Sequence, residues 1–230
     1  MRKRNKKIVC MTALSLVIST NIIANTGITI SAIDMEDKNY SITYEINKEN
    51  IDILSDTNIT ISDAKKWAKK YNATENFLNL ADLYWNYSKS NGGVNPALAY
   101  VQAAHETGFG KFTGVLDESY RNPCGLKNTN AGIGDDLIKQ AHKKFDNWTH
   151  GVLAHLDHLA LYAGSKGYPK SNIEQSYKQE ILNSKSTYDP RHFQSLYGSS
   201  KTVLDLSGKW ANGNYGEKLV VFYNELINIS

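Results

Sequence analysis

The sequence is poor in cysteine, which limits how the folded chain can be stabilised. Of its two cysteines, Cys10 lies in an N-terminal leader and Cys124 stands alone in the rest of the chain. Secreted chains often rely on disulfides, but a single remaining cysteine forms no intramolecular bridge. We therefore expect a hydrophobic core to supply the stability. The 198 residues left after the leader are enough for one domain with such a core.

A long uninterrupted hydrophobic run is also missing. Basic residues occupy positions 2, 3, 4, 6 and 7, and the apolar stretch from Ile8 to Ala24 is broken by serine, threonine and asparagine. A membrane span prefers about 20 clean apolar residues. The pattern instead predicts a secretory signal over residues 1–32, cleaved after Ala32. We expect a secreted, extracellular protein with no membrane attachment once this segment is removed, and no cysteine follows that would predict a lipoprotein.

A strong charge of either sign is absent from the predicted mature chain. The formal net charge is +3, but the leader holds five of the 26 basic residues and none of the 23 acidic ones. Removing it leaves 21 basic and 23 acidic residues, a net charge of −2. Nucleic acid is therefore not expected as a partner. No internal repeat or low-complexity tract is visible.

The apolar spacing predicts a mainly α protein of the α+β class. We interpret residues 33–58 as an arm or linker and residues 59–230 as one folded domain. A glycine-rich segment after the third helix predicts a β-hairpin, with its turn at 128–134 and its return near 142–145. Helices with a hairpin lobe between them would form a cleft. Helices are predicted over 64–71 (capped at Ser62 or Asp63), 74–87, 96–107, 151–162, 173–182, 199–206 and from 215 or 217 to 227.

Glu106 is the most informative candidate. Asn95-Pro96 is a helix-start signal, residues 97–104 are apolar on every face, and Gly108 is a left-handed stop. Glu106 then lies in the last turn of a buried helix, where the carbonyl ends disfavour a negative charge and raise the carboxyl pKa. A structural ion pair is the alternative, but its own turn holds no basic residue. A protonated carboxyl at neutral pH suits a general acid for glycosidic bonds.

Several motifs in order resemble those of one family. Glu106-Thr107-Gly108-Phe109-Gly110 is similar to the Glu-[Ser/Thr]-Gly-aromatic-Gly motif of family 73 glycoside hydrolases, bacterial endo-β-N-acetylglucosaminidases of the lysozyme-like superfamily. Residues 122–127 resemble its Asn-Leu-Phe-Gly-Ile-Lys segment, residues 145–148 its Tyr-Asp-Ser-Trp, and residues 215–219 its Tyr-Ala-x-Lys-Leu. The amino-acid sequences of residues 92–96, 114–117, 157–162 and 189–192 resemble those of a clostridial-type branch of this family. The resemblance covers about residues 60–228.

The resemblance implies a lysozyme-like helical domain that hydrolyses peptidoglycan. The bond cut would be the β-1,4 linkage between N-acetylglucosamine and N-acetylmuramic acid, with Glu106 as general acid. It implies glycan strands as partner and no need for a metal. We also expect a cell-wall-associated location, no cofactor and a monomer. Substrate contacts are expected from the residues that match the motifs or offer aromatic faces: Asn122, Lys127, Trp148 and Tyr215.

The second acidic group is less defined. The hairpin offers Asp135 and Asp136, and adjacent strand residues face opposite ways, so at most one points into the cleft. Asp117 and Glu118 are rivals, and the acetamide of the substrate could replace a second carboxylate. Pro123 and Cys124 also depart from the family's Leu and Phe.

Two other functions remain open at this point. A wall-binding module without catalysis would keep the aromatic cleft but need no acid. A wall peptidase would use Cys124 as nucleophile with His142, His150 or His155. His155 and His158 could share a helix face, but a zinc site needs a third ligand.

Overall fold

The computed structural model describes residues 28–29, 45–46, 50–130, 135–173 and 186–229. The chain divides into two compact units, Met1–Asn47 and Lys48–Ser230. In the first unit, strand β1 (Ile28–Thr29) pairs antiparallel with β2 (Glu45–Ile46). Most of the predicted leader, with its cleavage point after Ala32, lies outside the described residues and stays a prediction.

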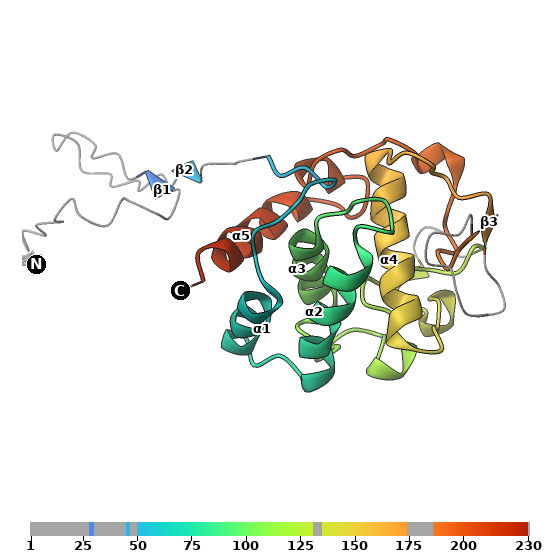
Figure 1. The fold of residues 1–230 in the computed structure, drawn as a ribbon. Helices are drawn as coiled ribbons and strands as arrows, with labels where there is room; N and C mark the ends of the chain where they lie inside the picture. The colour runs from blue at the N-terminus through green and yellow to red at the C-terminus, as the bar shows by residue number, and fades with distance from the viewer. Residues whose placement is uncertain (1–27, 30–44, 47–49, 131–134, 174–185, 230) are drawn as a thin grey trace, which may run out of the picture. The chain divides into compact units, whose positions relative to one another are not determined.

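The second unit is built from α-helices. Its described residues form α1 (Ile61–Lys70), α2 (Glu75–Tyr87), α3 (Pro96–Thr107), α4 (Trp148–Ala163) and α5 (Tyr215–Ile227). Strands β3 (Asn172–Ile173) and β4 (Ser186–Thr187) make a short parallel pair. The mainly α prediction is confirmed. Helix α3 lies among the other four helices and contacts each of them (Figure 1).

Helix α3 is the centre of the core, as its sequence predicts. Residues 96 to 104 are all buried. The Asn95 side chain caps the helix by accepting hydrogen bonds from the backbone N–H of Ala97 and Leu98, over 3.0 and 3.1 Å. Gly108 ends it in the left-handed region at φ +57°, which favours glycine because it has no Cβ. These two caps fix where the last turn of the helix ends, and therefore where Glu106 reaches the surface.

The compact unit begins earlier than the predicted boundary at residue 59. Ile53 is completely buried, and its carbonyl accepts a 2.8 Å hydrogen bond from the N–H of Asn95. The segment therefore belongs to the core rather than to a linker. Helix α1 also starts earlier than predicted, because Thr60 is its N-cap and forms a reciprocal capping box with Asp63.

The predicted hairpin is only partly a β structure. Lys127 and His142 form a single antiparallel bridge, flanked by 2.8 Å backbone hydrogen bonds on both sides. The tip at 131–134 lies outside the described residues. Between the tip and the predicted return near 142–145, the chain forms 3₁₀ turns at Asp135–Leu137 and Lys139–Ala141. A second apolar cluster holds the base of this lobe against α4: Cys124, Leu126, Phe145, Leu153, Ala154 and Tyr188.

The remaining elements differ from the prediction mainly at their ends. Helix α4 begins three residues earlier than expected, at Trp148, because Asn147 caps it. The region 199–206 contains a 3₁₀ turn at Leu204–Leu206 and an isolated bridge from Thr202 to Asp52 instead of an α-helix. The predicted helix 173–182 lies outside the described residues beyond Ile173, which belongs to β3. Helix α5 starts at Tyr215, one of its two predicted start points.

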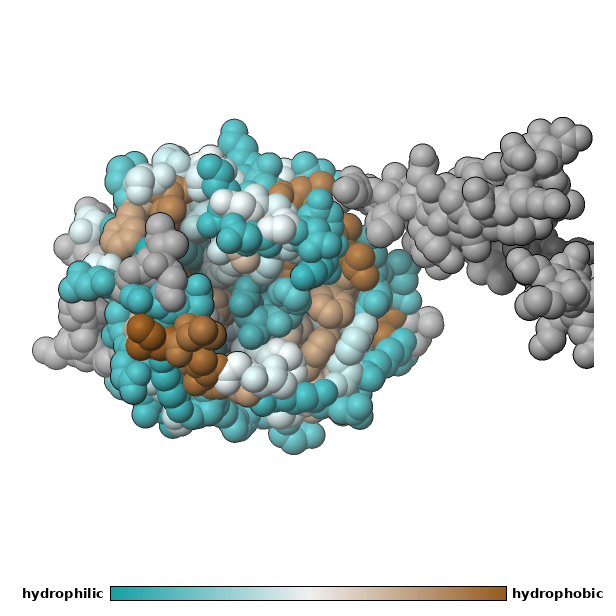
Figure 2. All heavy atoms as spheres, turned by 180° about the vertical axis from the view of Figure 1, so that it is seen from behind, coloured by the Kyte–Doolittle hydropathy of each residue, from teal (hydrophilic) through white to brown (hydrophobic). Residues whose placement is uncertain are grey.

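The surface is largely hydrophilic where Figure 2 shows it, with hydrophobic residues confined to separate small areas. In the described part of the chain, the large apolar side chains that are most exposed are Leu137, Ile138, Tyr197, Val221 and Ile227. None of the described helices has the length and hydrophobicity that crossing a bilayer would require.

Candidate active site

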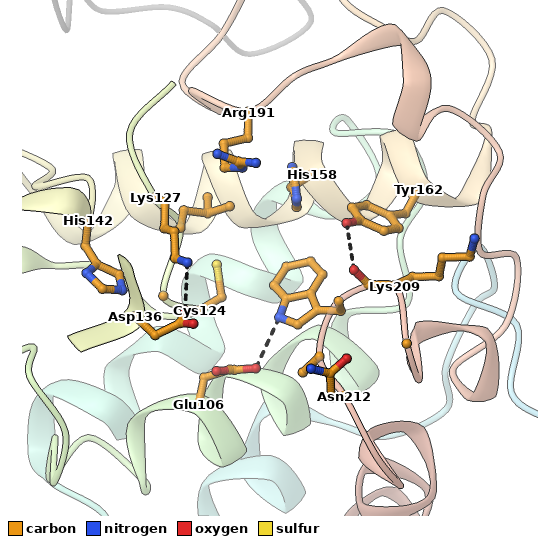
Figure 3. Close-up of a pocket in the computed structure, with 15 residues that line it drawn as sticks. Glu106, Cys124, Lys127, Asp136, His142, His158, Tyr162, Arg191, Lys209 and Asn212 are labelled. Atoms are coloured by element: carbon orange, nitrogen blue, oxygen red, sulfur yellow. Dashed lines mark hydrogen bonds and ion pairs between the residues drawn. The ribbon is translucent and has the colours of Figure 1, made fainter. Parts of the chain in front are cut away.

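A pocket of about 640 Å³ opens where the end of α3 faces the lobe, α4 and the loop before α5. Figure 3 shows its side chains, with His158, Tyr162 and Arg191 across the pocket from Glu106. The lining residues are Glu106, Cys124, Gly125, Leu126, Lys127, Asp136, His142, His158, Tyr162, Arg191, Gly208, Lys209, Trp210, Ala211 and Asn212.

Glu106 presents its carboxyl to this pocket from the last turn of α3. Oε1 accepts a hydrogen bond from the Trp210 indole Nε1–H, 3.2 Å away, and another from the Tyr215 hydroxyl. Glu106 is exposed to the pocket as a residue, although protein atoms crowd around its carboxyl group. Burial raises the pKa of Glu106 to about 7, although the hydrogen bonds from Tyr215 and Trp210 act to lower it. A substantial fraction is therefore protonated at neutral pH.

Tyr215 was expected to contact substrate, but the structure places it behind the pocket wall. It is buried at the start of α5, and its hydroxyl contacts Glu106 from behind while receiving a 2.8 Å hydrogen bond from Gln102 Nε2. It does not line the pocket. The position depends on Gly216, where an added Cβ would lie 2.5 Å from the Val203 carbonyl oxygen. Only a residue without a side chain lets α5 approach this closely.

The structure separates the two candidate aspartates of the lobe. Asp136 lines the pocket and pairs with Lys127, whose Nζ lies 2.8 Å from Asp136 Oδ1. The hydrogen bond from Lys127 lowers the pKa of Asp136, so this carboxyl is ionised at neutral pH. Asp135 lies outside the lining. Their divergence comes from the 3₁₀ turn that carries both.

The rival acids and two motif residues also lie outside the lining. Asp117 pairs with Lys139, and Glu118 accepts a hydrogen bond from Asn76. Asn122, expected to bind substrate, is buried and bonds backbone groups of its own turn, including the Leu126 carbonyl at 2.8 Å. Trp148, also expected to contact substrate, lies half-buried beside Phe112 with ring centroids 6.3 Å apart. Its motif position reflects helix packing.

Sequence reasoning missed the residue that joins the two sides of the site. Trp210 lies in the glycine-flanked loop 208–213, and its ring packs at 5.2 Å from His158 and 5.7 Å from Tyr162. The sequence signal that could have identified Trp210 as a site residue was a single tryptophan in a polar loop bounded by glycines. His158 in turn is held by the buried Asp189, 2.7 Å from its Nδ1. Burial opposes the charge of Asp189, but His158 and His192 outweigh it and hold its pKa well below the usual range.

Comparison with known proteins agrees with this geometry. Residues 81–228 match the glucosaminidase family model, described as mannosyl-glycoprotein endo-β-N-acetylglucosaminidase. The chain belongs to this glucosaminidase family. The family acts on peptidoglycan glycan, which indicates a glycoside hydrolase.

One curated relative of this chain is an uncharacterized protein of Borreliella burgdorferi. The two are 36% identical over 136 residues, which cover 59% of this chain and 56% of the relative. The chain thus spans little more than half the length of the relative it matches. No solved structure matches the chain significantly.

Cys124 of the glucosaminidase domain is a poor nucleophile. It lines the pocket but is only 3% exposed, and burial together with the nearby Glu106 raises the pKa of its thiol well above the usual value. A thiolate is the reactive form, so this environment works against a Cys-dependent peptidase. Among the described residues, no group of three or more His, Cys, Asp or Glu side chains is arranged to hold a metal ion.

Proposed function

We propose that this protein is an endo-β-N-acetylglucosaminidase that cleaves the β-1,4 bond between N-acetylglucosamine and N-acetylmuramic acid, with Glu106 as general acid. The observation that carries the proposal is the pocket-facing carboxyl with a pKa of about 7. A general acid works best when its pKa lies near the operating pH, because it is then both protonated and ready to donate. Family membership supports a peptidoglycan glycan as the substrate.

In the first step, Glu106 gives its proton to the glycosidic oxygen as the bond to the anomeric carbon breaks. The leaving sugar departs as a neutral alcohol, and positive charge develops on the ring that remains. The resulting Glu106 carboxylate is stabilised in place, because Tyr215 and Trp210 already donate hydrogen bonds to Oε1. No rearrangement of these donors is needed during proton transfer.

Asp136 is the group we assign to the developing positive charge. Its lowered pKa keeps it ionised, and Lys127 fixes its direction. An ionised carboxylate on the pocket wall either activates the attacking water or stabilises attack by the acetamide oxygen of the substrate. The two routes differ in stereochemistry: water activated directly inverts the anomeric centre, whereas acetamide participation retains it.

Export is part of the proposal, since peptidoglycan lies outside the cytoplasmic membrane. The basic and apolar leader over residues 1–32 supports secretion, and the expected mature protein begins at Ile33. Edman or mass analysis of the protein from culture supernatant tests this. A mature N-terminus at residue 33 is the expected result, and an intact leader on the extracellular protein would contradict it.

The decisive experiment is mass analysis of the muropeptides released from purified cell walls. A glucosaminidase creates new reducing ends on N-acetylglucosamine, and Glu106→Gln should create none while remaining folded. New reducing N-acetylmuramic acid would mean a muramidase, and new amino termini without reducing ends would mean a peptidase. Wall binding without any product would leave a binding module. Each of these three results contradicts the proposal.

A further inference from the structure

A row of buried polar side chains runs behind Glu106 through the apolar core. The Tyr84 hydroxyl of α2 lies 2.7 Å from His155 Nδ1, and His155 Nε2 of α4 lies 3.1 Å from Gln102 Oε1. Gln102 Nε2 of α3 is 2.8 Å from the Tyr215 hydroxyl, which contacts Glu106 Oε1. Helices α2, α3, α4 and α5 each contribute one member. Tyr84, Gln102 and His155 are 0% exposed.

The hydrogen bonds in this row have one consistent direction. Burial lowers the pKa of His155 to about 3, so its ring is neutral and has one donor and one acceptor nitrogen. Gln102 Oε1 can only accept, so His155 donates from Nε2 and accepts at Nδ1 from Tyr84. Gln102 Nε2 donates to the Tyr215 oxygen. Because Gln102 is a donor to the Tyr215 oxygen, the Tyr215 hydroxyl donates its own proton to Glu106.

We propose that Gln102, His155 and Tyr84 are positioning residues that direct the Tyr215 hydroxyl onto Glu106 Oε1, so that the catalytic proton is carried by Oε2. Oε1 already accepts from two donors, Tyr215 and Trp210, and has little capacity left for a proton of its own. Oε2 lies on the side of Gly125, a pocket residue. The inference rests on the proposed role of Glu106 as general acid.

The location of the row argues for a role beyond packing. Helix α3 is otherwise apolar over residues 96 to 104, and a glutamine in that stretch must have both ends satisfied to avoid a large desolvation cost. Fully connected buried networks specify one arrangement of their members. Here the network ends on the carboxyl that faces the pocket, rather than closing on backbone groups within the core.

The test compares Gln102→Met, which keeps side-chain length but removes both hydrogen bonds, with Tyr84→Phe, which removes only the far end of the row. Tyr100→Phe is the matched control. It deletes the hydroxyl of another buried tyrosine, which lies on α3. This hydroxyl contacts the Phe77 carbonyl instead of the row. We expect roughly tenfold lower kcat for Gln102→Met and about threefold for Tyr84→Phe, with KM within twofold and Tyr100→Phe near wild type.

The pH dependence supplies a readout that packing damage alone does not move. The Tyr215 hydrogen bond lowers the pKa of Glu106, so weakening it should raise that pKa and move the alkaline limb of kcat/KM to higher pH. Nearby titratable groups (Cys124, Asp136, Lys127, His158 and Asp189) are the same in all variants. The Glu106 titration can also be followed directly by ¹³C NMR of carboxyl-labelled protein, assigned with Glu106→Gln.

An upward shift of the Glu106 titration in Gln102→Met, with a smaller shift in Tyr84→Phe and none in Tyr100→Phe, is the expected result. Unchanged titration in both row variants would overturn the inference. If Gln102→Met fails to fold, the comparison of Tyr84→Phe with Tyr100→Phe decides alone. The NMR titration needs no substrate, so wild-type protein that cuts no glycan would refute the proposed function without deciding this inference.

Discussion

The Trp210 indole Nε1–H donates to Glu106 Oε1 over 3.2 Å, and this contact joins a loop near the C-terminus to the end of the central helix. The bond sits between the two walls of the pocket, because the Trp210 ring also packs against His158 and Tyr162. A single indole thus sets both the shape of the pocket and the chemistry of its acid. Its removal should change both.

Trp210→Phe should lower kcat/KM by about tenfold, the range expected for losing one hydrogen bond to a charged group. Since that bond lowers the pKa of Glu106, the alkaline limb of the pH profile should move upward. Trp148→Phe is the control, because Trp148 lies outside the pocket lining. Equal losses in the two variants, measured on cell-wall substrate, would refute the assignment of Trp210.

Asp136→Asn should reduce kcat by roughly 10²- to 10³-fold, in the range of a lost acid–base or charge-stabilising group. Asp135→Asn removes the same charge one residue away, from a side chain outside the lining, and should stay within twofold of wild type. Reducing-sugar release measures both. Two near-normal variants would instead point to the substrate acetamide acting without help from the lobe.

Gly216→Ala should destabilise the fold and weaken the site together. The new Cβ would meet the Val203 carbonyl oxygen at 2.5 Å, so α5 must shift and Tyr215 with it. Overpacking of this kind costs roughly 1–3 kcal/mol. Gly114→Ala is the matched control, because nothing lies within 4 Å of a Cβ there. Urea denaturation of the two variants checks the difference, and equal unfolding midpoints would contradict it.

Glu106→Gln should become relatively more stable than wild type as pH rises. The folded pKa of Glu106, about 7, lies above its ordinary value of 4.5, so the folded state binds this proton more tightly. Its contribution to stability is complete below pH 4.5 and is lost as pH rises through 7. The melting temperature of the variant minus that of wild type should therefore rise from pH 4.5 to pH 8. A constant gap would mean that Glu106 titrates normally.

The sequence predicted the parts of the site that depend on local signals. The Asn95-Pro96 start and the Gly108 stop place Glu106, and hydrophobic periodicity places α3 in the core. The burial that raises its pKa was expected, but the sequence emphasised the helix terminus, whereas enclosure by protein is the main cause. Family resemblance correctly identified the glucosaminidase family.

Long-range contacts were beyond the reach of the same reasoning. Trp210 is 104 positions from Glu106, and the Tyr84 and His155 pair is 71 apart, so neither partner is visible in any local pattern. The choice between Asp135 and Asp136 assumed a strand, but 3₁₀ turns fix their directions. Motif matching also assigned Tyr215, Trp148 and Asn122 to the substrate, although each has its contacts within the protein.

The most direct measurement is the titration of the Glu106 carboxyl itself, by ¹³C NMR of wild-type protein with the Glu106→Gln spectrum subtracted. The account predicts a midpoint near pH 7, well above the ordinary value of 4.5, with activity falling above that midpoint. A midpoint near 4.5 would mean that the carboxylate is ionised at neutral pH, and it would contradict Glu106 as the proton donor.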